Sequence, residues 1–183
     1  MSEDYLVRYC APTLAGIKTG NTFTCPYEDK EALLSSIRST NRKLTTKGLR
    51  LIPLRFSEKR ALLYLFRPKG LKKDLSCARA AQLLKEQGYP CENCEQCVAK
   101  LVRRIREQED FPHEIGLFLG YPAEDVKGFM ENNACDHKCV GCWKVYGDEA
   151  AAQKRFAQYK KCTRVYCDLW KKGKDIERLT VAG

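Results

Sequence analysis

Two apolar segments separated by a short polar turn constrain the fold of this chain most strongly. Leu49–Phe56 and Ala61–Phe66 are rich in apolar and aromatic residues and flank the polar sequence SEKR, which is the pattern of a β-hairpin. Pro53 has no amide hydrogen for a sheet ladder, so we expect its strand to lie at an edge or to contain a bulge. Most of the remaining chain has helical periodicity. The sequence therefore predicts an α+β fold in which five or six helices pack on a small, mainly antiparallel sheet.

Helices are indicated wherever apolar residues recur at three- and four-residue steps. We predict helices over Glu28–Asn41, over Leu71–Leu84 with an end at Gly88, around Val98–Ile105, from Pro122 onward, and from an N-cap at Asp148 to Gly173. Pro112 can open a short helical turn that Gly120 ends, or Ile115–Tyr121 can be a buried strand, with the helix preferred. Trp143–Tyr146 is strand-like.

The amino-terminal stretch Leu6–Lys18 begins like a strand, meets Pro12 and continues through small residues toward Gly20. This pattern predicts a loop held near the core. With 183 residues and 21.0 kDa, the chain fits a single domain. The cysteine-rich segment around residues 88–142 is a candidate insert within that domain.

The cysteine content and the amino-terminal sequence indicate the cellular compartment in which the protein is expected. The sequence MSEDYLVRYC is acidic and lacks a basic segment followed by an apolar one, and no apolar run reaches membrane-spanning length. We therefore expect a cytoplasmic protein. Because thiols there are normally reduced, the eleven cysteines indicate metal or thiol chemistry rather than a disulfide scaffold.

The chain is basic, with 33 Lys and Arg against 23 Asp and Glu and a formal net charge of +10. Such a charge attracts nucleic acid, a phosphorylated ligand or an acidic protein surface. No helix-turn-helix, RNA-recognition or zinc-finger pattern accompanies it. We therefore favour an anionic small molecule or cofactor over nucleic acid as the partner.

Two cysteine clusters are candidate metal sites. Zinc is bound by thiolates at about 2.3 Å, and CxxC spacing lets two sulfurs converge on one ion. The two clusters are farther apart than the roughly 15–20 residues of zinc-ribbon patterns, so the fold would have to bring them together. An iron–sulfur cluster is a less favoured cofactor, and reduced thiols without metal are the remaining interpretation. The candidate ligands are Cys91, Cys94 and Cys97 in CENCEQC, and Cys135, Cys139 and Cys142 in CDHKCVGC.

The stretch FPHEIGLFLGYPAEDVKGF, Phe111–Phe129, places His113 beside Glu114. A nucleophilic cysteine needs its thiolate, which a histidine stabilises while a third polar group orients the ring. Cys10, followed by Ala-Pro-Thr, is the candidate nucleophile, and His113 with Glu114 would complete the catalytic set. His113 could instead be a structural histidine or a ligand to a metal or cofactor.

Three stretches taken together resemble a known family. They are CAPTLAGIK at Cys10–Lys18, FPHEIGLFLGYPAEDVKGF, and CVGCWKVYGD at Cys139–Asp148. The combination is similar to small cytosolic bacterial proteins, typical of anaerobes, that are grouped as domain of unknown function 3793. The resemblance spans nearly the whole chain and implies no assigned activity.

These observations lead to three hypotheses for function. The first is a small-ligand or cofactor-binding protein of anaerobic metabolism, possibly redox-linked, in which Lys18 and Lys144 neutralise an anionic ligand and Trp143 and Tyr146 stack on it. The second is a thiol-dependent enzyme using Cys10 and His113. The third is a zinc-stabilised interaction module.

Overall fold

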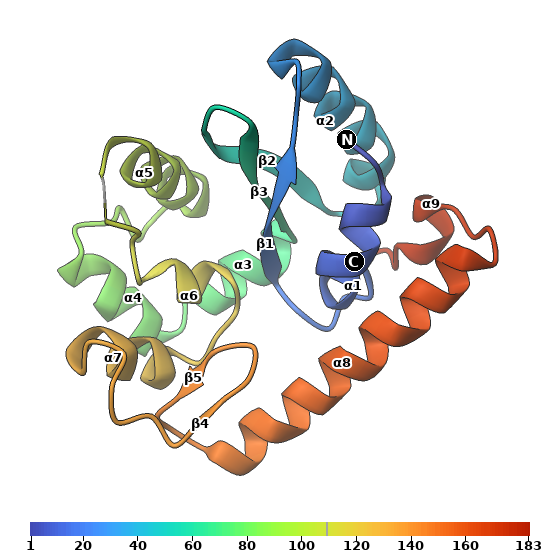
Figure 1. Ribbon diagram of the computed structural model, residues 1–183. Helices are drawn as coiled ribbons and strands as arrows, with labels where there is room; N and C mark the ends of the chain where they lie inside the picture. Colours follow the sequence, from blue (N-terminus) through green and yellow to red (C-terminus); the bar gives the residue numbers. More distant parts are fainter. Residues whose placement is uncertain (109) are drawn as a thin grey trace. The chain divides into compact units, whose positions relative to one another are not determined.

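The chain forms two compact units. A computed structural model describes residues 1–108 and 110–183. One unit comprises Met1–Lys69 and Tyr159–Gly183, and the other comprises Gly70–Gln158 (Figure 1). The second unit contains the whole cysteine-rich segment 88–142, and the prediction of one domain with an insert there stays a prediction. Among the described residues, no helix has both the length and the apolar character needed to cross a bilayer.

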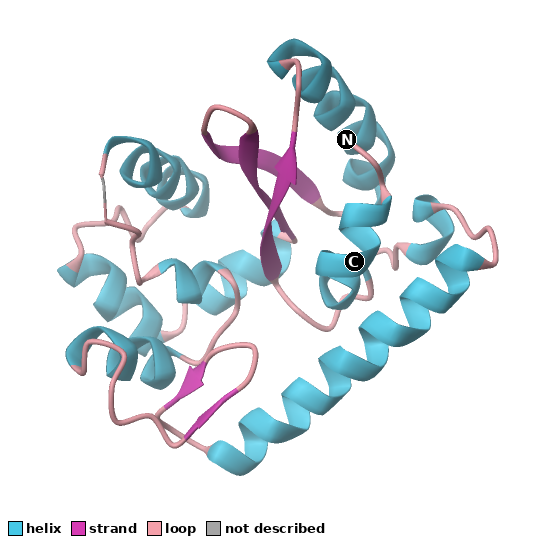
Figure 2. Ribbon diagram, viewed as in Figure 1, coloured by secondary structure: helices cyan, strands magenta, loops and turns pink. Residues whose placement is uncertain are grey.

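The first unit is built on a three-stranded antiparallel sheet in the order β1-β3-β2 (Figure 2). The strands are β1 (Gly20–Pro26), β2 (Arg50–Phe56) and β3 (Arg60–Phe66). The predicted hairpin is confirmed as β2 and β3. The expectation for Pro53 is also confirmed, because β2 lies at the edge of the sheet and the register shifts between Pro53 and Arg55.

Helices pack on one face of this sheet and bury its apolar side chains. The helices are α1 (Asp4–Leu14), α2 (Lys30–Leu44) and α9 (Ile176–Leu179), and a 3-10 turn, η1 (Thr45–Lys47), follows α2. Their buried residues form one core cluster with Phe23 of β1, Leu51 of β2 and Leu63 of β3. Asp29 caps α2 by accepting hydrogen bonds from the amides of Glu31 and Ala32, which explains the sharp start of the predicted helix.

The prediction of a strand end and loop at Leu6–Lys18 was wrong. This segment is mostly the helix α1, and Pro12 lies inside its last turn. The helix buries residues at helical spacing, namely Leu6, Val7, Cys10, Ala11 and Leu14. Burial of this face offsets the backbone hydrogen bond that proline cannot donate.

The second unit is mainly helical. It contains most of α3 (Pro68–Leu75), then α4 (Ala78–Glu86), α5 (Cys94–Glu107), α6 (Ile115–Phe118) and α7 (Ala123–Glu131). A two-stranded antiparallel ribbon follows, formed by β4 (Cys139–Val140) and β5 (Lys144–Val145). The long helix α8 (Glu149–Lys171) begins in this unit and ends in the first. The α+β class with a small antiparallel sheet is therefore confirmed.

One predicted helix is two helices. The segment Leu71–Leu84 is divided between α3 and α4 at Ser76 and Cys77. The Ser76 hydroxyl donates to the carbonyl oxygen of Lys73, and Cys77 adopts φ −59° and ψ 131°, outside the helical region. Local bonding by serine at a helix end competes with continuation of the helix.

Candidate ligand-binding site

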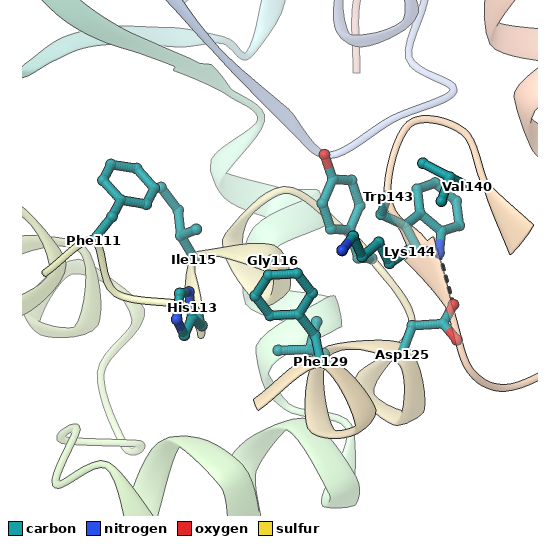
Figure 3. A pocket seen from close by; sticks show the side chains of 11 residues that line it. Phe111, His113, Ile115, Gly116, Asp125, Phe129, Val140, Trp143 and Lys144 are labelled. Atoms are coloured by element: carbon teal, nitrogen blue, oxygen red, sulfur yellow. Dashed lines mark hydrogen bonds between the residues drawn. The ribbon is translucent and has the colours of Figure 1, made fainter. Parts of the chain in front are cut away.

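A pocket of about 290 Å³ in the second unit is the best candidate site. It lies among the segment before α6, the helices α6 and α7, and the β4–β5 ribbon (Figure 3). Most of its lining is aromatic or aliphatic, which is typical of small-molecule sites. The lining residues are Phe111, His113, Ile115, Gly116, Tyr121, Asp125, Val126, Phe129, Val140, Trp143 and Lys144.

Glycine at position 116 allows the two helices beside the pocket to approach closely. A Cβ atom there would lie 2.7 Å from Cγ2 of Val126 and 3.1 Å from the ring of Tyr121, closer than side chains pack. The chain then reverses at Gly120, which has φ +75°, a conformation that favours glycine. The amide of Tyr121 donates to the carbonyl oxygen of Gly116 over 2.9 Å, which holds the backbone of this turn against α6, and Tyr121 lines the pocket.

Asp125 ties the ribbon to α7. Its carboxylate is 2% exposed, and Oδ2 accepts a hydrogen bond from the indole Nε1 of Trp143 over 2.7 Å. Oδ1 accepts from the backbone amides of Tyr146 and Gly147 over 2.8 and 2.7 Å. Three N–H donors therefore satisfy one buried charge. This arrangement fixes both the rotamer of Trp143 and the position of the ribbon.

Stacked and edge-on rings form the walls of the pocket. Trp143 stacks on Tyr121 with a centroid separation of 4.8 Å and an interplanar angle of 29°. Its other neighbour is Phe156, whose ring meets it edge-on at 4.5 Å. His113 meets Phe129 edge-on at 5.0 Å. Aromatic contacts of this geometry are stabilising, so they favour this arrangement of the pocket walls.

Two basic side chains, Lys144 and His113, line the pocket. The ammonium of Lys144 lies 5.9 Å from the ring centroid of Phe129 and donates to the carbonyl oxygen of Ala134 over 2.7 Å. His113 is exposed and lies on the other side of Phe129 (Figure 3). Three donors of the protein offset the charge of Asp125, which lessens its repulsion of a ligand anion. Lys144 and His113 are basic side chains of the lining that can bind such an anion.

Glu114, predicted to orient His113, points elsewhere. Its carboxylate is 2% exposed and forms an ion pair with Arg104 of α5 over 2.7 Å. The hydroxyl of Tyr89 donates to the same carboxylate over 2.8 Å. Burial of Tyr89, together with the neighbouring Glu114 charge, raises the pKa of the phenol. Glu114 thus joins α5 to the start of α6 and is engaged in a buried structural network.

Cys10 and Lys18 belong to the first unit, whereas His113, Glu114, Trp143, Lys144 and Tyr146 belong to the second. Cys10 is completely buried in the core under the sheet, and this burial raises the pKa of its thiol. Lys18 is 7% exposed, and its ammonium donates to Oδ1 of Asn21 over 2.8 Å. A buried, protonated thiol is a poor nucleophile, so the structure adds no support to catalysis by Cys10 with His113, which stays a prediction.

Tyr146 does not line the pocket. Its ring lies against Gly128, where any side chain would overlap it. Burial raises the pKa of this phenol, and the neighbouring Cys135 and Asp136 raise it further. Among the residues that predictions did not single out, Tyr121 and Phe129 line the pocket and Asp125 supports it.

The predicted metal ligands form no site in the described residues. Within 1–108 and 110–183, no group of three or more His, Cys, Asp or Glu side chains is arranged to hold a metal ion. Cys91, Cys94 and Cys97 lie at and before the start of α5, and Cys139 lies in β4 near Glu149. Cys135 and Cys142 are exposed. Zinc and an iron–sulfur cluster therefore gain no support from the arrangement of these thiols.

The chain is similar to a known family of proteins. A model of the family described as "Protein of unknown function (DUF3793)" matches residues 6–180. No curated protein and no solved structure matches the chain.

Proposed function

The chain belongs to the family DUF3793, and from this premise we propose that it binds a small, planar, anionic molecule in the pocket of its second unit. The observation that carries the proposal is the combination of aromatic walls with Lys144 and His113 at one cavity of about 290 Å³. The sequence hypothesis of ligand binding is kept, but its site is reduced to residues of the second unit.

The size and lining of the pocket indicate the class of ligand. A cavity of about 150 Å³ holds benzene, so about 290 Å³ accommodates one or two fused rings with a small substituent. The rings would lie between the Tyr121–Trp143 stack and Phe129. Apolar burial supplies most of the affinity in such a site, and one well-placed charge supplies orientation.

The charge of the ligand follows from which groups are already paired. Asp125 accepts three hydrogen bonds within the protein and is sequestered from a ligand. Lys144 uses one donor on the carbonyl oxygen of Ala134, and an ammonium has three. Its remaining donors can therefore bind a carboxylate, and the imidazole of His113 can add a second bond.

Isothermal titration with acid and amide pairs tests this proposal. Nicotinate and nicotinamide are nearly isosteric but differ by one charge, and quinaldate and quinaldamide extend the comparison to two rings. We expect the acid of at least one pair to bind at least tenfold more tightly than its amide, a difference of about 1.4 kcal/mol. Lys144→Met should abolish this preference while leaving the affinity for the amide largely unchanged.

Lys127→Met is the matched control. Lys127 lies on α7 as an exposed residue, is ion-paired with Glu131 and does not line the pocket. Its replacement removes the same charge from the same unit, so it corrects for the general effect of net charge. Equal affinities for acid and amide in the unaltered protein, or equal losses in the two lysine variants, would contradict the proposal.

A further inference from the structure

The sequence CENCEQC places three thiols around the first turn of α5, outside the proposed ligand pocket. Asn93 caps this helix by accepting from the amides of Glu95 and Gln96. The amide of Cys97 donates to the carbonyl oxygen of Asn93 over 3.0 Å. Cys94 and Cys97 are therefore one turn apart on the same side of a well-formed helix start.

We propose that Cys94 and Cys97 are a redox-active pair that forms an intrahelical disulfide at the start of α5 when the protein is oxidised by a peroxide. Side chains at i and i+3 on a helix have Cβ atoms about 5–6 Å apart, and a disulfide requires about 3.5–4.5 Å. First turns of helices often tighten to 3-10 geometry, in which residues i and i+3 eclipse each other. A small local adjustment is therefore sufficient.

The exposure of the two thiols assigns the order of reaction. Cys94 is half-buried, whereas Cys97 is 1% exposed and its thiol donates to the carbonyl oxygen of Pro90 over 3.2 Å. The Cys94 thiol loses its proton, and the thiolate attacks one oxygen of hydrogen peroxide; the O–O bond breaks, and a sulfenic acid and hydroxide form, the hydroxide taking up the released proton to give one water. The Cys97 thiol likewise loses its proton, and its thiolate attacks the Cys94 sulfur and expels hydroxide, which takes up that proton to give a second water. Two thiols and one peroxide give one disulfide and two waters.

Electrostatics around the pair set its pH dependence. Burial, followed by Glu95, raises the pKa of Cys94, and the ammonium of Lys72 opposes this. Burial and the other two thiols of the motif raise the pKa of Cys97 to about 11. Because the thiolate is the reacting form and the pKa values of both thiols are raised, the disulfide forms slowly at pH 7. We expect it to form about tenfold faster at pH 8, where the thiolate fraction is about tenfold larger.

A single tryptic peptide reports on all three thiols. Cleavage after Lys85 and Lys100 releases EQGYPCENCEQCVAK, which contains Cys91, Cys94 and Cys97. Reduced protein is treated with hydrogen peroxide, the remaining thiols are alkylated, and the peptide is analysed by tandem mass spectrometry. We expect one alkyl group, on Cys91, and a mass lower by two hydrogens from the bond between Cys94 and Cys97.

Two variants complete the test, with folding checked by circular dichroism. Cys91→Ser should still form the bond, whereas Cys94→Ser should leave both of its remaining motif thiols alkylated. Alkylation of all three cysteines after peroxide treatment would overturn the proposal, and so would an alkyl group on Cys94 or Cys97 with a bond between the other two cysteines of the motif. Formation of this disulfide does not depend on ligand binding. The disulfide proposal can therefore fail while the proposed function holds, and the reverse is also true.

Discussion

Loss of the Asp125 carboxylate should destabilise the second unit more than any change to an exposed residue nearby. The carboxylate accepts hydrogen bonds from the indole of Trp143 and from the amides of Tyr146 and Gly147, all within 2.8 Å. Asp125→Ala leaves these three donors without their acceptor. A buried donor left unpaired costs about 1–3 kcal/mol, and more when its partner was charged.

The expected loss is smaller than the sum of three separate penalties, because bonds to one acceptor are not additive. We expect Asp125→Ala to lower the free energy of unfolding by about 3–5 kcal/mol, as when a buried charged partner is removed. Asp125→Asn keeps one oxygen for the two backbone amides but turns an NH₂ group toward the indole N–H. Its expected cost is about 1–3 kcal/mol, for one unpaired donor and the lost charge.

Urea unfolding followed by tryptophan fluorescence measures these differences. The chain has two tryptophans, so a Trp170→Phe background leaves Trp143, beside Asp125, as the reporter. Glu124→Gln is the matched control, because Glu124 shares the first turn of α7 but is exposed and pairs with Arg79 at 3.3 Å. Its loss should cost no more than about 1 kcal/mol. If the losses of unfolding free energy in Asp125→Ala and Glu124→Gln differ by less than about 1 kcal/mol, the buried Asp125 carboxylate does not stabilise the second unit as we expect.

Three further changes should alter stability in ways that the structure specifies. Glu114→Gln removes the charge that pairs with Arg104 and should cost about 1–3 kcal/mol in urea unfolding, since hydrogen bonds to charged groups contribute about that much. Gly128→Ala inserts a Cβ into the ring of Tyr146 and should cost at least about 2 kcal/mol, because overpacking displaces α7 or the ribbon. The pKa of Cys97 is raised to about 11 in the folded protein, compared with 9.0 for an unperturbed cysteine. Between these two pH values the thiol is protonated in the folded state but ionised in the unfolded chain. Its contribution to stability should be complete below pH 9 and fall as the pH rises from 9 to 11, and Cys97→Ala should lack this part of the decline.

Each of these three predictions has a control and a result that would contradict it. Glu107→Gln breaks an exposed pair with Arg103, so a cost equal to that of Glu114→Gln would count against the buried network. Gly173→Ala meets no atom within 4 Å but has φ +81°, and it should cost only about 1 kcal/mol. A larger cost there than at Gly128 would contradict the packing argument. Parallel stability profiles for the unaltered protein and Cys97→Ala between pH 9 and 11 would show that the Cys97 thiol is not protected.

Local patterns in the sequence predicted much of the fold. The β2–β3 hairpin, the edge position of Pro53 and the helix after Pro122 follow from features within about ten residues of one another. Turn chemistry, alternation and first-turn charges act at that range. The prediction for residues 6–18 was wrong because a proline near a helix end is a weak signal for a break, whereas Leu6, Cys10 and Leu14 have helical spacing and are buried on one face. The strand β1 was not predicted, because it has few apolar residues. Phe23 and Cys25 are buried in the core only through the pairing of β1 with β3, which the local sequence does not indicate.

The site was predictable only in part, because local sequence patterns do not reveal contacts between residues far apart in the chain. His113, Trp143 and Lys144 were identified from their motifs, and all three line the pocket. Asp125 was not identified as a site residue. Its role depends on the indole of Trp143, 18 residues away, and no local pattern indicates a tertiary hydrogen bond. The two cysteine clusters had the spacing of metal ligands, but spacing along a chain does not fix the directions in which the sulfurs point.

The most direct test of the central claim is an NMR titration of the two indole N–H signals with quinaldate, assigned with the Trp170→Phe variant. Trp143 lines the pocket and belongs to the second unit, whereas Trp170 packs against the core of the first. We expect a saturable shift of the Trp143 signal that weakens in Lys144→Met, with the Trp170 signal unchanged. No shift at any concentration of quinaldate, or a shift confined to Trp170, would contradict a planar-anion site in this pocket.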